Sequence, residues 1–107
     1  MDISVVIPLF NEEESLKELY DWIASMMQSN QFLYEVIFID DGSTDTSWEV
    51  IEDLSQTTST VKGIRFQKNY GKSQALDAGF QIAAGNVVIT MDADYKTVLT
   101  KFLDCTS

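Results

Sequence analysis

The stretch YEVIFIDDGSTD, residues 34–45, decides the fold class. It contains an almost continuous apolar run, residues 34–39, which ends in two adjacent acids, Asp40 and Asp41, and in a turn with Gly42. Strands buried on both faces have such continuous runs, whereas strands with one solvated face alternate. Because strands of the first kind usually belong to parallel sheets covered by helices, the stretch predicts a central strand of an α/β domain.

Other apolar runs and helical patterns extend this prediction along the chain. Further strands are expected at residues 3–9, 61–66 and 86–91, and helices at residues 12–28, 44–54 and 73–84. This alternation predicts an α/β protein, a three-layer α/β/α sandwich with a mostly parallel sheet and right-handed crossovers. In the third helix, Leu76, Phe80 and Ala83 share the side that is expected to be buried.

Polar residues at the expected helix starts indicate capping. Asn11 is the expected N-cap of the first helix, whose first turn then holds the acids of residues 12–14, where the helix dipole favours anions. Ser43 or Thr44 is the expected cap of the second helix.

The 107 residues suffice for one domain, and their net charge of −10 is unevenly distributed. Residues 1–60 hold 13 acids and 1 base, whereas residues 61–107 hold 4 acids and 6 bases. Such an acidic chain is not expected to bind nucleic acid through a broadly basic surface.

The sequence has no histidine and a single cysteine, Cys105. Catalytic histidines and zinc sites with imidazole ligands are therefore excluded within it. A lone cysteine forms no internal disulfide, no apolar run reaches the roughly 18 residues of a spanning helix, and the N-terminus lacks the basic region of a signal peptide. We therefore expect a cytoplasmic location.

Polar and ionisable residues follow each expected strand, in residues 8–12, 40–45, 68–72 and 92–94. In open α/β sheets, ligands bind outside the carboxyl ends of the strands. The clustering predicts a ligand site at that edge. It is not a dinucleotide site of the common kind, because no G-x-G-x-x-G loop follows the first strand.

Asp92 and Asp94 follow the last expected strand at a spacing that allows both carboxylates to reach one hard cation. Oxygen ligands favour Mg²⁺ or Mn²⁺, which substrate phosphates also hold. A solvated turn that caps the next element explains the same two acids, so both interpretations stay open.

Asp41 and Lys72 are candidates from the middle strands. A carboxylate at position 41 could accept hydrogen bonds from a base N–H or a ribose hydroxyl. Lys72 forms a basic cluster in the sequence with Lys62, Arg65 and Lys68. That cluster is either a counter-charge for a diphosphate or a scattered, solvated edge.

Four motifs in order match a known family: SVVIPLFNEEESL (4–16), IDDGSTD (39–45), NYGK (69–72) and MDAD (91–94). Together they resemble the N-terminal half of the family 2 inverting glycosyltransferases of the GT-A fold, in particular the polyprenyl-phosphate type that acts on undecaprenyl or dolichyl phosphate. The resemblance covers residues 3–94 and implies a truncated GT-A fold, that of the nucleotide-diphospho-sugar transferases.

The resemblance also implies roles for the candidate residues. Pro8, Phe10, Asn11 and Glu12 would cup the base and ribose of a sugar nucleotide, and Asp41 would contact the base.

At the diphosphate end, Asp92 and Asp94 would form the Asp-x-Asp motif, which holds the ribose and a divalent cation, Mg²⁺ or Mn²⁺. Lys72 would lie near the phosphates. The implied reaction transfers a sugar, with a UDP-sugar favoured over a GDP-sugar as donor, to a lipid phosphate with inversion.

The chain departs from the family pattern after residue 94. Residues 1–94 look like the donor-binding half, whereas residues 95–107 form an atypical tail in which Tyr95-Lys96 replaces the usual Leu-Gln. The half that carries the general base is missing, so no catalytic residue is expected in this chain and it is expected to be inactive alone. Full-length members of this type are membrane-associated, which places them at the cytoplasmic face of a membrane.

Two alternatives stay open from the sequence. A receiver-like signalling domain is also acidic, α/β and of this length, although its acidic doublet follows the first strand rather than the second. A non-catalytic assembly fragment is the other alternative, because truncation leaves the strand at 86–91 as an apolar edge. That edge, or the tail, is expected to support a homo-oligomer.

Overall fold

The structure is a computed structural model, and it describes residues 1–91. Its elements alternate in the predicted order: β1 (Ile3–Leu9), α1 (Leu16–Ser29), β2 (Tyr34–Asp40), α2 (Ser47–Thr57), β3 (Val61–Arg65), α3 (Lys72–Ile82) and β4 (Val87–Thr90). The predicted metal ligands Asp92 and Asp94 and the tail at 95–107 lie outside the described residues.

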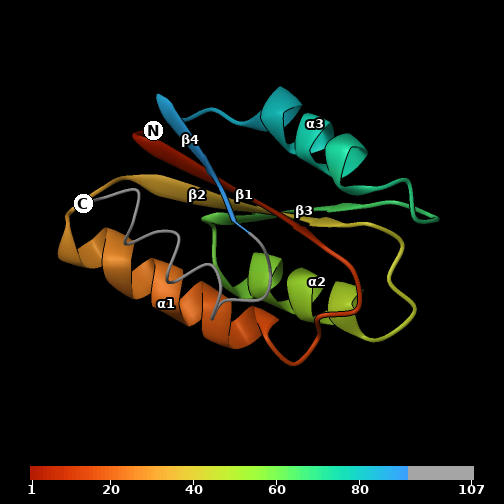
Figure 1. Cartoon of the computed structure of the whole chain (residues 1–107). Coiled ribbons are helices and arrows are strands. Elements are labelled where there is room, and N and C mark those ends of the chain that lie inside the picture. The colour runs from red at the N-terminus through yellow and green to blue at the C-terminus, as the bar shows by residue number, and fades with distance from the viewer. Residues whose placement is uncertain (92–107) are drawn as a thin grey trace.

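The four strands form one parallel sheet in the order β3-β2-β1-β4. Helices α1 and α2 cover one face and α3 covers the other (Figure 1). The predicted α/β/α layering and parallel sheet are therefore confirmed.

The strand order excludes the receiver-like alternative. Receiver domains have the flavodoxin-like order 2-1-3-4-5, in which the third strand pairs with the first. Here β3 pairs with β2, and β4 takes the place beside β1.

Two apolar layers enclose the central strands, which explains their continuous sequence pattern. On one face, Ile7 and Phe38 are fully buried in a cluster with Leu19 and Ile23 of α1. On the other face, the buried cluster is smaller and joins Val6, Ile37 and Ile39 to Ala75 of α3. Every residue of β1 and β2 is buried.

The predicted buried side of α3 is confirmed for Leu76 and Ala83, which pack against the smaller cluster, and is wrong for Phe80. The buried residues of α3 are Ala75 and Gly79, whereas Phe80 is 48% exposed. A Cβ atom at Gly79 would lie 2.4 Å from Cγ1 of Val6, so only glycine fits there. Close approach of the helix backbone to the sheet decided the buried side, rather than the size of the side chains.

Glu35 is the one charged residue inside the second apolar run, and it joins three parts of the fold. Its side chain is buried, and Oε2 accepts hydrogen bonds from Ser4 Oγ and from the backbone N–H of Ala84, the latter at 2.7 Å. The Nζ atom of Lys62 lies 2.7 Å from Oε1. Burial raises the pKa of Glu35, but the bonds from Lys62, Ser4 and Ala84 outweigh it and hold the pKa below its usual value.

The same network anchors the approach to β4. The backbone N–H of Gly85 donates to Ser4 Oγ at 2.7 Å, beside the bond from Ala84 to Glu35. The connection from α3 to β4 is thereby held against the first residues of β1 and β2.

Strand β4 lies at one edge of the described sheet, as the apolar-edge prediction required. Val87 is 54% exposed and Val88 is 41% exposed. Among the described residues, no helix is long and apolar enough to cross a membrane.

Candidate functional site

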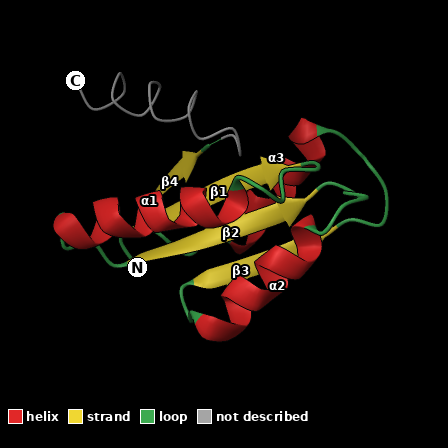
Figure 2. Ribbon diagram, turned by 90° about the horizontal axis from the view of Figure 1, so that it is seen from below, coloured by secondary structure: helices red, strands yellow, loops and turns green. Residues whose placement is uncertain are grey.

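The loops that follow β1, β2 and β3 meet at the carboxyl edge of the sheet (Figure 2). Side-chain hydrogen bonds join the first loop to the second and the second to the third. The structure thus brings together the polar segments at 8–12, 40–45 and 68–72 that the sequence placed at one edge.

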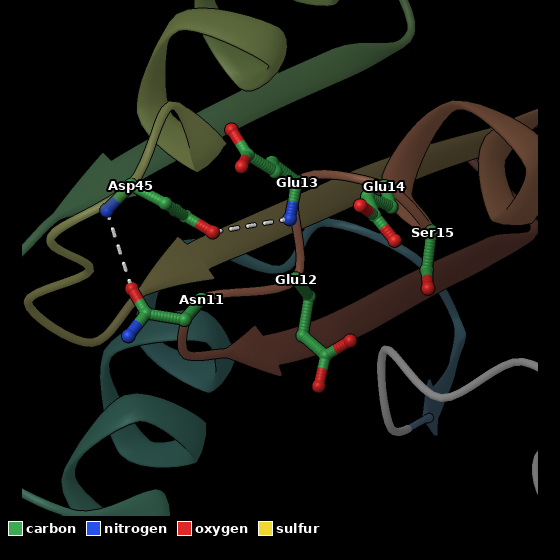
Figure 3. A pocket seen from close by; sticks show the side chains of 6 residues that line it. All are labelled: Asn11, Glu12, Glu13, Glu14, Ser15 and Asp45. Carbon is green, nitrogen blue, oxygen red and sulfur yellow. Dashed lines mark hydrogen bonds between the residues drawn. The ribbon is translucent and has the colours of Figure 1, made fainter.

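Asn11 joins the first two loops. Its φ of 54° places it in the left-handed region, which Asn tolerates better than most residues. Its Oδ1 accepts hydrogen bonds from the backbone N–H groups of Thr44 at 2.8 Å and Asp45 at 3.3 Å (Figure 3). Its own backbone N–H donates to Ser43 Oγ at 2.8 Å.

Glu13 and Asp45 extend this junction. The backbone N–H of Glu13 donates to Asp45 Oδ2 at 3.5 Å, and Glu13 Oε2 accepts from the backbone N–H of Thr46 at 3.0 Å (Figure 3). Asp45 Oδ1 also accepts from the backbone N–H of Ser47 at 2.9 Å. Burial raises the pKa of Asp45, but its bonds to Ser47 and Glu13 outweigh that effect and lower the pKa below its usual value.

These bonds correct the capping prediction. Asn11, Ser43 and Thr44 bind the neighbouring loop instead of capping a helix of their own. Helix α1 consequently begins at Leu16 and α2 at Ser47, later than predicted, and the acids of residues 12–14 precede the first turn of α1.

A pocket of about 200 Å³ opens beside this junction. Its lining residues, drawn in Figure 3, are Asn11, Glu12, Glu13, Glu14, Ser15 and Asp45. The lining is rich in carboxylates, which repel phosphate groups and accept hydrogen bonds from hydroxyl and N–H groups. The ring of Phe10, which precedes this segment, is 43% exposed.

The two acids at the end of β2 have different surroundings. Asp40 is fully buried, and its Oδ1 accepts a hydrogen bond from the backbone N–H of Ser43 at 2.8 Å. Asp41 is 6% exposed, and its two carboxylate oxygens accept from the backbone N–H groups of Tyr70 at 2.8 Å and Gly71 at 3.0 Å. Asp41 therefore anchors the third loop through these two hydrogen bonds.

Gly42 brings the second and third loops into contact. Its φ is +77°, and a Cβ atom there would lie 2.5 Å from the carbonyl carbon of Lys68. The third loop leads from this contact to Gly71 and Lys72, where α3 begins. Lys72 thus starts a helix whose N-terminus the Asp41 contacts hold at the carboxyl edge.

The four basic residues that cluster in the sequence do not form one cluster in the structure. Lys62 pairs with Glu35, and the guanidinium of Arg65 lies 5.8 Å from the ring centre of Trp48. Lys68 lies 5.8 Å from the ring centre of Tyr70, in the loop that Asp41 holds. Only Lys68 and Lys72 of the cluster therefore belong to the third loop and the helix start after it.

The predicted metal ligands Asp92 and Asp94 cannot be placed with the other candidates, because they lie outside residues 1–91. Met91 directly precedes Asp92 in the sequence. Its side chain is buried, and its backbone N–H donates to the carbonyl oxygen of Val6 at 3.1 Å. Within residues 1–91, no group of three or more acids or cysteines is arranged to hold a metal ion.

Comparison with known proteins supplies the family. The family model described as glycosyl transferase family 2 matches residues 4–96. The chain belongs to glycosyl transferase family 2. Its sequence is 45% identical over 93 residues to an undecaprenyl-phosphate 4-deoxy-4-formamido-L-arabinose transferase of Aeromonas hydrophila, a match that covers 86% of this chain and 28% of that protein.

Two solved glycosyltransferases share the architecture. Residues 1–349 of S. aureus TarS are 26% identical, with a TM-score of 0.74 over 88% of this chain and 28% of that chain. The mannosyltransferase PcManGT of Pyrobaculum calidifontis, solved with GDP-Man and Mn²⁺, is 25% identical, with a TM-score of 0.72 over 86% of this chain and 27% of that chain. The expected family and GT-A fold are confirmed, and the chain spans less than a third of each of these proteins.

Sequence reasoning missed the residues that join the loops, chiefly Glu13, Ser43 and Asp45. Their partners lie more than 30 residues away in the chain, and short-range rules assign the same residue types to helix caps. The position of DDGSTD directly after a buried strand indicates that these residues lie at the site. It does not predict which residues of the first loop they bind.

Proposed function

We propose that this chain is the donor-binding part of a glycosyltransferase that transfers a sugar from a nucleotide sugar to a lipid phosphate, with inversion. A UDP-sugar is the favoured donor, because the motif at residues 4–16 resembles the bacterial undecaprenyl-phosphate type. The name of the Aeromonas hydrophila relative supports a lipid-phosphate acceptor. With such an acceptor, the proposed site of the reaction is the cytoplasmic face of a membrane.

The observation that carries the proposal is the joining of three loops at the carboxyl edge of the sheet. Asn11 ties the first loop to the second, and Asp41 ties the second to the third. A ligand that enters at this edge meets hydrogen-bond acceptors on one side of β2 and the start of α3 on the other. That polarity matches a nucleoside diphosphate, which has hydroxyl and N–H donors at one end and anionic phosphates at the other.

In this proposal, Pro8 and Phe10 lie against the base, and the exposed ring of Phe10 offers a stacking surface worth about 1–3 kcal/mol. Glu12 accepts from the ribose. Asn11 shapes the loop, because its Oδ1 already accepts from the second loop. Asp41 lies beside the base and positions the third loop.

At the diphosphate end, Lys72 and the N-terminus of α3 face the anionic groups, where the helix dipole adds to the lysine charge. Asp92 and Asp94 are carboxylates, the ligand type that Mg²⁺ and Mn²⁺ prefer, so the donor set fits such an ion. A divalent cation, when bound, neutralises the charge that develops on the leaving diphosphate.

We further propose that the isolated chain binds the donor but does not transfer the sugar. Transfer to an acceptor hydroxyl requires a general base that accepts its proton, whereas a phosphate acceptor is already anionic near pH 7 and has to be held in line with the donor. The family resemblance implies an acidic acceptor motif after the donor-binding half, and this chain spans 28% of the Aeromonas hydrophila relative.

The experiment is a calorimetric titration of the 107-residue protein with UDP and with GDP, each with and without Mn²⁺. We expect UDP to bind with a Kd of about 1 mM or lower, and more tightly with Mn²⁺. Phe10→Ala is expected to weaken UDP binding about tenfold. Phe32→Ala is the matched control, because Phe32 is 44% exposed against 43% for Phe10 and lies just before β2, at the opposite end of the sheet.

No binding of either nucleotide to the folded protein at about 10 mM would contradict the donor site. Equal losses from both phenylalanine variants would place the nucleotide elsewhere. Sugar transfer by the isolated chain would contradict the proposed inactivity.

A further inference from the structure

Ser47, the first residue of α2, holds the loop that follows β1 from inside the fold. Its Oγ atom accepts a hydrogen bond from the backbone N–H of Glu12 at 3.0 Å. Ser47 is fully buried, so this bond is shielded from water. The backbone N–H of Ser47 donates in turn to Asp45 Oδ1 at 2.9 Å, which fixes the start of the helix. The backbone at Glu12 is therefore attached to the first turn of α2.

The start of α2 also binds the carboxylates of Glu13 and Asp45, which line the pocket. Glu13 Oε2 accepts from the backbone N–H of Thr46 at 3.0 Å. The Asp45 carboxylate accepts from Ser47 and, at 3.5 Å, from the backbone N–H of Glu13. A helix N-terminus attracts anions, so these two charges are stabilised where they lie. At Glu12, by contrast, α2 contacts the backbone N–H.

The side chains of Glu12 and Glu13 consequently point in different directions. In Figure 3, the side chain of Glu13 lies toward α2, whereas that of Glu12 points away from Asp45. The φ of 54° at Asn11 turns the chain just before them. Neighbouring carboxylates repel each other, and the attachments to α2 keep these two apart. Through the backbone, the start of α2 thus sets the direction of the Glu12 carboxylate.

We propose that Ser47 is a positioning residue of the donor site, which directs Glu12 to a hydroxyl group of the nucleotide ribose. This inference rests on the proposed function, in which Glu12 accepts from the ribose. An ionised carboxylate accepts hydrogen bonds and donates none, so it favours a ligand that has a hydroxyl at this point over one that lacks it. Ser47 is buried and acts on this selection only through the backbone of the loop.

The expected signature is a change in selectivity as well as in affinity. The wild-type protein is expected to bind UDP about tenfold more tightly than the deoxy analogue that lacks the hydroxyl bound by Glu12. In Ser47→Ala, the Glu12 N–H loses its acceptor and the carboxylate loses its fixed direction. We expect this preference to fall to about threefold or less, while the affinity for the deoxy analogue changes by less than about twofold.

The experiment is a set of calorimetric titrations of the 107-residue protein with UDP, 2′-deoxy-UDP and 3′-deoxy-UDP, each with Mn²⁺. The proteins are the wild type, Ser47→Ala, Glu12→Ala and the double variant, which form a double-mutant cycle. Because Ser47 acts through Glu12, the double variant is expected to bind UDP within about twofold of Glu12→Ala alone.

Ser55→Ala is the matched control, because it removes a serine hydroxyl from the same helix. Ser55 Oγ donates to the carbonyl oxygen of Glu52 at 2.8 Å, within α2, and the variant is expected to change each affinity by less than about twofold. Amide hydrogen exchange supplies a readout without ligand. In Ser47→Ala, the Glu12 amide is expected to exchange at least about tenfold faster, while the amides of β2 keep their protection and show that the variant is folded.

The outcomes separate this inference from the proposed function. No preference of the wild type for UDP over either deoxy analogue, or a preference that Ser47→Ala leaves unchanged, would overturn the positioning role and leave the donor site standing. Additive losses in the cycle would also overturn it, because Ser47 would then act without Glu12. No binding of UDP to the folded wild type would contradict the donor site itself and, with it, this inference.

Discussion

The carboxyl end of β2 and strand β4 differ in how their polar groups are paired. At β2, the side chains of Asp40 and Asp41 each accept backbone hydrogen bonds, and the following residues bind the loop after β1. At β4, the outer backbone groups and the exposed valines have no partner within residues 1–91. The comparison indicates that contacts within residues 1–91 hold the loops at the carboxyl end of β2, whereas no described strand pairs with the outer side of β4.

The largest expected effect is the loss of the network that holds the connection from α3 to β4. Glu35→Ala removes the acceptor of Ser4 Oγ and of the Ala84 N–H, and each buried group left unpaired costs about 1–3 kcal/mol. Lys62 is half-exposed, so loss of its ion pair adds little. We expect a loss of about 3 kcal/mol in the free energy of unfolding, measured by urea denaturation.

Glu52→Ala, on the exposed face of α2, is the control and is expected to change the stability by less than about 0.5 kcal/mol. The pH dependence gives an independent check. Because the folded-state pKa of Glu35 lies below its usual value of 4.5, its contribution is present above that pH and is lost as the pH falls through the folded-state pKa. Glu35→Gln is expected to flatten this acid-side loss, and an unchanged pH profile would contradict the role of Glu35.

A smaller effect is expected where the second and third loops touch. Gly42→Ala puts a Cβ atom 2.5 Å from the backbone of Lys68 and also strains a positive φ, so we expect a loss of about 2–3 kcal/mol. Gly71→Ala is the matched comparison, because its φ is +101° but a Cβ atom there meets nothing within 4 Å. We expect Gly71→Ala to cost about 1 kcal/mol less, measured by thermal unfolding. Equal costs would show that the two loops do not pack as described.

More of the fold than of the site could be predicted from the sequence. Continuous apolar runs identified the parallel strands, since burial on both faces is a property of each strand alone. Glu35 interrupts one run, and its partners Ser4 and Ala84 belong to other elements, so no local pattern predicts the network. The roles of Asn11 and Gly79 likewise depend on a loop and a strand that the chain reaches only after folding.

The smallest expected effect tests the role of Asp41. Asp41→Asn keeps one acceptor and puts an amide N–H₂ group against a backbone N–H, so the third loop loses one of its two anchors. We expect UDP affinity to fall about fivefold to tenfold. If Asp41 acts through the third loop, its effect and that of Lys72→Ala are not additive in a double-mutant cycle.

Additive losses in that cycle, together with a loss of preference for UDP over GDP, would show that Asp41 acts by contact with the base alone. Asp53→Asn, on the exposed side of α2, is the matched control for the removal of one charge.

The central claim is that the joined loops at the carboxyl edge bind a nucleoside diphosphate. The most direct test is the change of backbone amide NMR signals of the 107-residue protein on titration with UDP and Mg²⁺. The account predicts that the shifts concentrate in residues 9–15, 41–46 and 68–72, with none at Phe32 and Leu33 before β2. Shifts that centre on the amino ends of the strands, or no shifts at about 10 mM UDP, would contradict it.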